Sequence, residues 1–226
     1  MKKEIILTEE QKESLKFYVT NDYLLVNALL WNEDIKVINE LIDLINLDGR
    51  GVMKEALEMG FDIRWNCSKE EGERKFKVFE KRFPLIDSEE VRNKIISRAK
   101  QDINNMMSSF SLLEEDIVVY RNIKTKYISD IKENSVLEYK GFSSCSLMPH
   151  IPENASYGSK GSTLFEIEVP KGTPIIRIDL MEDIRNEEDE VILPPISFII
   201  EHIDRDNNKV FMRVINNNNN NNKYLR

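Results

Sequence analysis

The chain has 226 residues and a formal net charge of −8, from 40 acidic and 32 basic side chains. A chain of this length forms one large domain or two small ones. Its composition, 41% hydrophobic and 32% charged, is that of a globular protein rather than a disordered one. The acidic balance argues against a general nucleic-acid coat, because such proteins need a surplus of Lys and Arg to displace counterions from phosphates.

The acidic residues are unevenly distributed. Seven carboxylates and one arginine lie between Asp179 and Glu190, and this stretch alone carries −6 of the net charge. Such a run of charge is usually a solvated loop or surface. This acidic run leads directly into a predicted strand, so its last carboxylates can also belong to a functional site.

Cysteine and histidine are too sparse to indicate a disulfide framework or a metal site. Cys67 and Cys145 have no CxxC spacing, and His150 and His202 have no ligand spacing. The apolar run at residues 5–7 is too short for a signal peptide, and no stretch approaches the ~20 apolar residues of a membrane span. We expect no metal, no signal peptide and no membrane partner, and a chain that works in the cytoplasm or is delivered into a host cytosol.

Helices are predicted in the first half, residues 1–115. Thr8 and Gln11 form a capping-box pattern, residues 19–22 interrupt the helix, and residues 23–30 restart it. Apolar residues at helical spacing predict a third helix over residues 36–46, ended by residues 49–51. A second capping pattern, from Asp87 and Glu90, opens a long helix.

The segment Arg74–Phe83 interleaves basic residues with three phenylalanines. Such a pattern can bind nucleic acid. The phenylalanines also follow the spacing of an amphipathic helix that faces the core, and this interpretation is favoured.

Strands are predicted after Glu115, where apolar residues recur at period two and β-branched residues are frequent. The candidate strands are residues 117–120, 162–169, 173–178, 190–193, 197–203 and 210–215, with a hairpin turn at residues 206–208. Strand–helix–strand units do not repeat, which disfavours a doubly wound sheet. We therefore expect an α+β protein in which N-terminal helices pack on a mostly antiparallel, two-sheet β core.

The predicted organisation is one domain over residues 1–215, with a helical half at 1–115 and a strand-rich half at 116–215. Seven consecutive asparagines follow at residues 216–222. Because such a polar tract has nothing to bury, we expect residues 216–226 to be disordered.

Three short segments occur in a characteristic order: Val118–Arg121, Gly141–Leu147 and Glu188–Pro194. Each is a weak signal alone. Together they resemble the mono-ADP-ribosyltransferase family of bacterial toxins and phage enzymes, in its Arg…Ser-x-Ser…Glu-x-Glu branch. The resemblance extends from about Thr8 to Ile215.

The resemblance implies an ADP-ribosyltransferase-like fold, NAD as the substrate, and release of nicotinamide. In its terms Glu190 stabilises the positive charge that develops on the ribose and bonds its 2′-hydroxyl. Glu188, two residues earlier, orients or deprotonates the acceptor. Arg121 binds the pyrophosphate, for which a planar guanidinium is well suited.

Further roles come from the same resemblance. Ser144 holds Glu190 and the ribose, Ser146 supports the strand turn, and backbone groups at Asn122 bind the nicotinamide amide. The expected catalytic residues are Arg121, Ser144, Glu188 and Glu190. The expected NAD-binding residues are Arg121, Asn122, Ser144, Ser146 and Glu190.

The Glu-x-Glu pair indicates the acceptor, because members of the resembled family with this pair modify arginine. The surrounding acids would also favour a cationic acceptor. The expected reaction is transfer of ADP-ribose to arginine of a target protein, with some NAD glycohydrolase activity. Transfer to DNA or RNA bases and a catalytically idle interaction module stay open as alternatives, and an inhibitor or delivery partner is not visible in sequence.

The chain departs from the family pattern at several positions, among them Cys145 and Asn122. Cys145 stands where Thr is common, and we interpret it as a buried small residue. Asn122 stands where Gly is usual, and Asn tolerates unusual backbone angles better than most residues.

Overall fold

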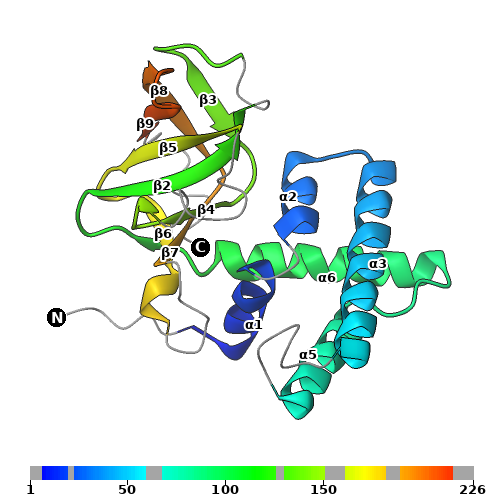
Figure 1. Cartoon of the computed structure of the whole chain (residues 1–226). Helices are drawn as coiled ribbons and strands as arrows, with labels where there is room; N and C mark the ends of the chain where they lie inside the picture. Colours follow the sequence, from blue (N-terminus) through cyan, green and yellow to red (C-terminus); the bar gives the residue numbers. More distant parts are fainter. Residues whose placement is uncertain are drawn as a thin grey trace. The chain divides into compact units, whose positions relative to one another are not determined.

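The computed structural model describes residues 7–19, 23–59, 68–125, 130–150, 161–181 and 189–215 (Figure 1). The chain divides into two compact units. One contains residues 1–19 and 104–226, and the other contains residues 20–103. We call them the sheet unit and the helical unit.

The helical unit is built from helices that share a buried apolar cluster. They are α2 (Tyr23–Trp31), α3 (Ile35–Met59), α5 (Lys69–Arg82) and the part of α6 (Glu89–Met107) that precedes Asn104. Leu25 from α2, Ile42 from α3, and Ile95 and Ala99 from α6 share one buried cluster with Phe83. The helical pattern predicted for this part of the chain is therefore confirmed.

Helix α3 is longer than its sequence predicts, since it continues through Gly49 and Gly51 to Met59. The prediction that these glycines end the helix is wrong. A Cβ atom at Gly49 would collide with the ring of Phe79 in α5, so the glycine lets the two helices approach closely. Arg50 also ties the region together, because its Nη2 donates to the carbonyl of Phe83 at 3.2 Å.

The basic segment lies on α5 and its phenylalanines form the apolar side of that helix. The rings of Phe76 and Phe79 have centroids 5.9 Å apart, and those of Phe79 and Phe83 are 5.5 Å apart. Phe83 is buried and Phe79 packs against the same cluster. This confirms the amphipathic-helix interpretation over that of a nucleic-acid surface.

The start of α6 differs from the predicted cap. The helix begins at Glu89, and the hydroxyl of Ser88 accepts a hydrogen bond from the amide of Val91 at 3.4 Å. The predicted cap at Asp87 is one residue too early, because Ser88 occupies the position from which a side chain reaches that amide.

The sheet unit begins with α1 (Glu9–Phe17), whose predicted capping box between Thr8 and Gln11 is present. Its strands are β1 (Ser111–Leu112), β2 (Ile117–Lys124), β3 (Val136–Tyr139), β4 (Ser143–Ser146), β5 (Ser162–Val169), β6 (Pro174–Arg177), β7 (Glu190–Leu193), β8 (Ile196–Asp204) and β9 (Lys209–Ile215). A 3-10 helix, η4 (Ile178–Leu180), follows β6. Strands β1, β3 and β4 were not predicted.

The described strands form one hydrogen-bonded series in the order β1-β6-β7-β4-β2-β5-β9-β8-β3. All its pairs are antiparallel except β5 with β9. The series has a narrow junction, because β2 and β4 share only the pair Tyr120↔Ser146. This junction separates a four-stranded part from a five-stranded part, and the predicted α+β class with a mostly antiparallel core is confirmed.

A large part of the core of the sheet unit lies on one face of this series, and Ile176 and Ile192 are buried on the other face. Val119 of β2, Cys145 of β4, Phe165 of β5 and Val191 of β7 belong to one buried cluster, and Phe198 of β8 joins it. Alternate residues of β4 and β7 therefore point away from this core. The Ser-x-Ser and Glu-x-Glu segments contain those alternate positions.

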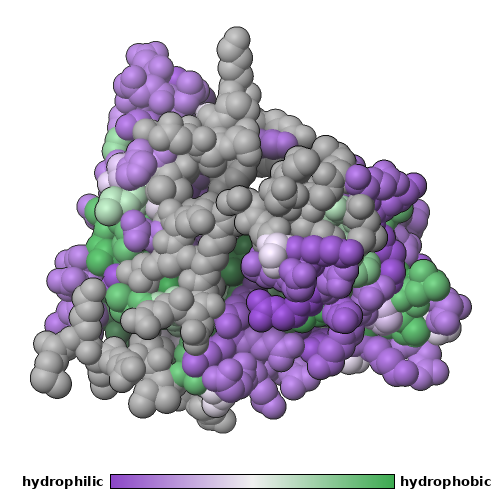
Figure 2. Space-filling view, turned by 60° about the horizontal axis from the view of Figure 1, so that its bottom comes forward, coloured by the Kyte–Doolittle hydropathy of each residue, from purple (hydrophilic) through white to green (hydrophobic). Residues whose placement is uncertain are grey.

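The surface of the described residues is mostly hydrophilic in the view of Figure 2, with separate hydrophobic areas. Leu47 and Leu85, which are 71% and 70% exposed, are its most exposed large apolar side chains. No described helix is long and apolar enough to cross a membrane. The predicted tail at residues 216–226 lies outside the described residues, and the single-domain organisation stays a prediction.

Candidate active site

Two of the three sequence motifs meet across adjacent strands of the four-stranded part. β4 pairs antiparallel with β7, which places Ser146 opposite Glu190 and Ser144 opposite Ile192. The hydroxyl of Ser144 donates a hydrogen bond to Oε1 of Glu190. A hydrogen bond to a charged carboxylate is stronger than one between neutral groups. One hydroxyl of the Ser-Cys-Ser segment thus fixes the carboxylate of β7.

Ser146 has a different task, which is to hold the end of its strand. Its side chain is buried, and its Oγ accepts a hydrogen bond from the amide of Met148 at 3.0 Å. The amide of Leu147 donates to the carbonyl of Asp189 at 3.0 Å. Asp189 has φ of 44°, a left-handed conformation that turns the chain into β7 immediately before Glu190.

Arg121 lies on β2, across the junction from the serine motif. Its residue is half-buried, and its Nη2 donates a hydrogen bond to Oη of Tyr139 at 3.3 Å. The guanidinium also lies over the Tyr139 ring, with Cζ 5.2 Å from the ring centroid. Nη1 is buried and has no hydrogen-bond partner among the described residues. A buried charged donor without a partner is costly, which marks this atom as a place for an acceptor.

Arg121 carries its charge at physiological pH, as arginine does in proteins. Burial alone disfavours the guanidinium cation, whereas the ionised forms of Tyr139, Cys145 and Tyr18 favour it, and the pKa of Arg121 is raised above its usual value. Tyr18 is itself fixed, because its hydroxyl donates to the carbonyl of Phe142 at 2.9 Å. The cation is therefore permanent at any physiological pH.

Cys145 is influenced by both charged groups. Burial raises the pKa of its thiol to about 12, with Arg121 acting to lower it and Glu190 acting to raise it. The pairing explains this position, since Arg121 and Cys145 each lie one residue from the Tyr120↔Ser146 pair and so face the same side. Its burial is as expected, and its thiol is protonated and unreactive at neutral pH.

Of the two remaining predicted site residues, the structure describes Asn122 but not Glu188. Asn122 is half-buried on β2 and pairs with Leu164 of β5. Glu188 and most of the acidic run, residues 182–188, lie outside the described residues. The structure thus brings Ser144, Ser146 and Glu190 together directly.

Sequence reasoning missed Tyr139, whose hydroxyl and ring both contact Arg121. It lies on β3, a four-residue strand that pairs with β8 and places Tyr139 opposite Ile196. The signal was present as a short Val-Leu-Glu-Tyr run of strand-favouring residues, but it is too brief to distinguish from a loop.

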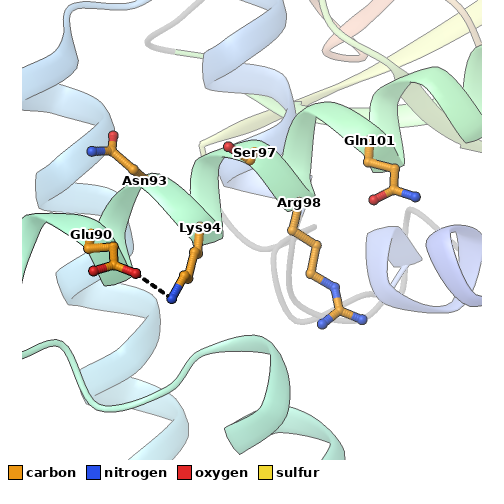
Figure 3. A pocket seen from close by; sticks show the side chains of 6 residues that line it. All are labelled: Glu90, Asn93, Lys94, Ser97, Arg98 and Gln101. Carbon is orange, nitrogen blue, oxygen red and sulfur yellow. Dashed lines mark ion pairs between the residues drawn. The ribbon is translucent and has the colours of Figure 1, made fainter.

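A hollow of about 500 Å³ lies on α6. Figure 3 shows that its side chains all come from that helix, with Lys94 turned toward Glu90 at 2.7 Å. The lining residues are Glu90, Asn93, Lys94, Ser97, Arg98 and Gln101. An open helix surface with a solvated ion pair offers no enclosed chemistry. Among the described residues, no group of three or more His, Cys, Asp or Glu is placed to hold a metal ion.

Solved structures with the same fold are ADP-ribosyltransferase toxins. The Vis toxin of Vibrio splendidus, in complex with its M6 inhibitor, is 18% identical, with a TM-score of 0.52 over 92% of this chain and 73% of Vis. Plx2a of Paenibacillus larvae is 17% identical, with a TM-score of 0.50 over 92% of this chain and 87% of Plx2a. No curated protein sequence gives a significant match.

The family comparison covers more than half of the chain. Residues 83–224, which include all three motifs, match the model of the ADP-ribosyltransferase exoenzyme family. Enzymes of this kind use NAD as their substrate. The match and the shared fold together place the chain in the ADP-ribosyltransferase exoenzyme family.

Proposed function

We propose that this enzyme transfers ADP-ribose from NAD to an arginine side chain of a target protein and releases nicotinamide. The observation that carries the proposal is the hydrogen bond from Ser144 to Glu190, at the edge of the junction between β4 and β2. It holds a carboxylate on the same face as the serine motif, and Arg121 on the neighbouring strand β2 supplies a permanent cation. A ligand that is cationic at one end and anionic at the other matches this arrangement.

Glu190 is proposed to stabilise the transition state. The bond between the ribose and nicotinamide breaks, the electron pair leaves with nicotinamide, and positive charge spreads over the ribose. A carboxylate fixed in advance stabilises that charge without reorganising during the reaction. Ser144 supplies the fixing, since its donated hydrogen bond limits the rotamers of Glu190.

Arg121 is proposed to bind the pyrophosphate. Its Nη2 is used by Tyr139, whereas Nη1 is buried and lacks a hydrogen-bond partner among the described residues. A phosphate oxygen would satisfy that donor. Asn122 follows directly, and we assign its backbone to the nicotinamide amide; Ser146 is assigned to the turn that presents Glu190.

Glu188 is proposed to act on the acceptor. It lies two residues before Glu190, in the Glu-x-Glu pattern that goes with modification of arginine in the branch this chain resembles. A guanidinium is a poor nucleophile while charged, so a carboxylate that takes its proton as the new bond forms would assist transfer. The Vis toxin has been crystallised with agmatine, a guanidinium compound, which supports an arginine-like acceptor here. Without an acceptor, water would take its place and give NAD hydrolysis.

The nucleic-acid alternative loses its main support, because the phenylalanines of α5 pack inward. Arg82, at the end of the basic segment, is also buried and paired with Asp102. Neither the aromatic rings nor that arginine is therefore presented for stacking with bases.

An acceptor competition tests the proposal. The protein is incubated with NAD and, separately, with agmatine, an arginine-containing protein extract, and single- or double-stranded DNA and RNA, and products are identified by mass spectrometry. We expect nicotinamide release with all additions and ADP-ribose on agmatine and on protein arginine. Modified nucleic acid with unmodified arginine would favour the alternative, and no nicotinamide release by folded protein would indicate an idle module.

A further inference from the structure

Arg121 and Tyr139 come from strands that are far apart in the sheet order. Strands β5, β9 and β8 separate β2 from β3, yet the guanidinium of Arg121 reaches the hydroxyl of Tyr139 at 3.3 Å. The five-stranded part must therefore curl until its last strand approaches its first. Its edge strand supplies a side chain to the candidate NAD site.

Tyr139 makes two contacts that constrain different motions of the guanidinium. The ring lies 5.2 Å from Cζ, which favours a cation over its face. The hydroxyl accepts from Nη2, which fixes rotation of the guanidinium about its long axis. With both in place, Nη1 is left as the buried donor that lacks a hydrogen-bond partner among the described residues.

We propose that Tyr139 is a positioning residue for NAD binding, which orients Arg121 so that Nη1 faces the pyrophosphate. The inference rests on the proposed role of Arg121. Tyr139 would then be a contributor to NAD binding from outside the three motifs, and the affinity for NAD would depend on the position of β3. Removal of the hydroxyl would leave a second guanidinium donor unsatisfied and free to turn away.

A merely structural role for Tyr139 predicts a different result. Tyr139 also packs against the core cluster of the sheet unit and pairs with Ile196 in the β3–β8 ladder. If packing were its whole contribution, Tyr139→Phe would behave as the parent protein, because phenylalanine retains the ring. Val136→Ala is the matched control, since Val136 lies on the same strand and is 58% exposed.

The test measures NAD affinity by calorimetry and initial rates of nicotinamide release for Tyr139→Phe, Tyr139→Ala and Val136→Ala. We expect Tyr139→Phe to weaken NAD binding about tenfold, with kcat changed by less than about twofold. Tyr139→Ala should weaken it further because the ring is also lost, and Val136→Ala should bind as the parent does. Unchanged affinity in folded Tyr139→Phe would overturn the proposal.

A double substitution makes the inference specific to Arg121. Lysine lacks the planar fork, so in an Arg121→Lys background Tyr139→Phe should change NAD affinity by less than about twofold. An undiminished effect of Tyr139→Phe there would show that Tyr139 acts elsewhere and overturn its positioning role.

A spectroscopic measurement separates this inference from the proposed function. Nitrogen NMR of the arginine side chains should show restricted rotation of the Arg121 guanidinium in the parent protein and free rotation in Tyr139→Phe. Restricted rotation without any NAD binding would contradict the proposed function and, with it, positioning for NAD. Free rotation in the parent would contradict the orienting contact itself.

Discussion

Among the described arginines, Arg82 is buried and Arg121 has a buried Nη1, and the surroundings of the two differ. In the helical unit, Arg82 is paired with the carboxylate of Asp102, and both side chains are almost fully buried. In the sheet unit, Arg121 lies against the neutral phenol of Tyr139, and its Nη1 has no hydrogen-bond partner among the described residues. A structural arginine is neutralised by its own protein, whereas one that binds an anionic substrate must keep its charge available.

The largest expected effect on stability lies in the helical unit. Arg82→Ala leaves the carboxylate of Asp102 buried and uncompensated, and we expect a loss of about 3–5 kcal/mol in the free energy of unfolding. Chemical denaturation of the parent and variant measures it. A double Arg82→Met, Asp102→Leu variant should recover most of the loss, and a loss undiminished in the double variant would contradict the pairing account.

The next effect separates the two arginines by function. Arg121→Lys keeps the positive charge but loses the planar fork, so we expect NAD binding to weaken by about a hundredfold, or about 2.7 kcal/mol. Calorimetric titration with NAD measures it. At a temperature where Arg82→Ala remains folded, that variant should bind NAD within about threefold of the parent, because Arg82 is paired with Asp102 of its own unit and has no proposed role in NAD binding. An equal loss of NAD affinity in Arg121→Lys and Arg82→Ala would contradict the division between a substrate-binding and a structural arginine.

A smaller effect concerns the serine that holds the carboxylate. Ser144→Ala removes the donated hydrogen bond to Glu190, and we expect kcat for nicotinamide release to fall about tenfold. Initial-rate measurements check it. Ser146→Ala instead loses the contact with the Met148 amide and should lower the unfolding free energy by about 1 kcal/mol. Identical kinetic defects in the two serine variants would contradict their separate tasks.

The smallest effect is a pH dependence from Cys145. Burial raises the pKa of this thiol to about 12 from the usual value of 9.0, so the folded state binds its proton more tightly than the unfolded state. The resulting stability is complete below pH 9 and is lost as the pH rises from 9 to 12. Between pH 8 and pH 10 we expect a loss of about 1.4 kcal/mol that is absent in Cys145→Ala. Equal pH profiles for the two proteins would contradict it.

The sequence predicted the elements whose periodicity is long enough to be distinctive. The strand over residues 162–169 and the helix carrying Phe76 and Phe79 are found where expected. The end of α3 was misplaced because Gly49 was interpreted through its intrinsic helix propensity. Its actual role, close contact with Phe79, depends on a helix distant in sequence.

The candidate site was predicted only where its residues belong to motifs. Ser144 and Glu190 were expected to meet, and the β4–β7 register brings them into contact. Tyr139 was missed because its contact depends on the curl of five strands, and neither β3 nor that curl leaves a local pattern. Long-range closure of a sheet is a property of pairing and twist, which single-sequence periodicity does not encode.

The central claim is that the Glu190 carboxylate, held by Ser144, stabilises the cationic ribose while Glu188 serves the acceptor. One assay tests it: nicotinamide release and agmatine modification measured side by side for the parent, Glu190→Gln, Glu188→Gln and the exposed control Glu168→Gln. We predict that Glu190→Gln loses both activities by at least about a hundredfold, that Glu188→Gln keeps hydrolysis but loses transfer, and that the control keeps both. Wild-type nicotinamide release by Glu190→Gln would contradict the account.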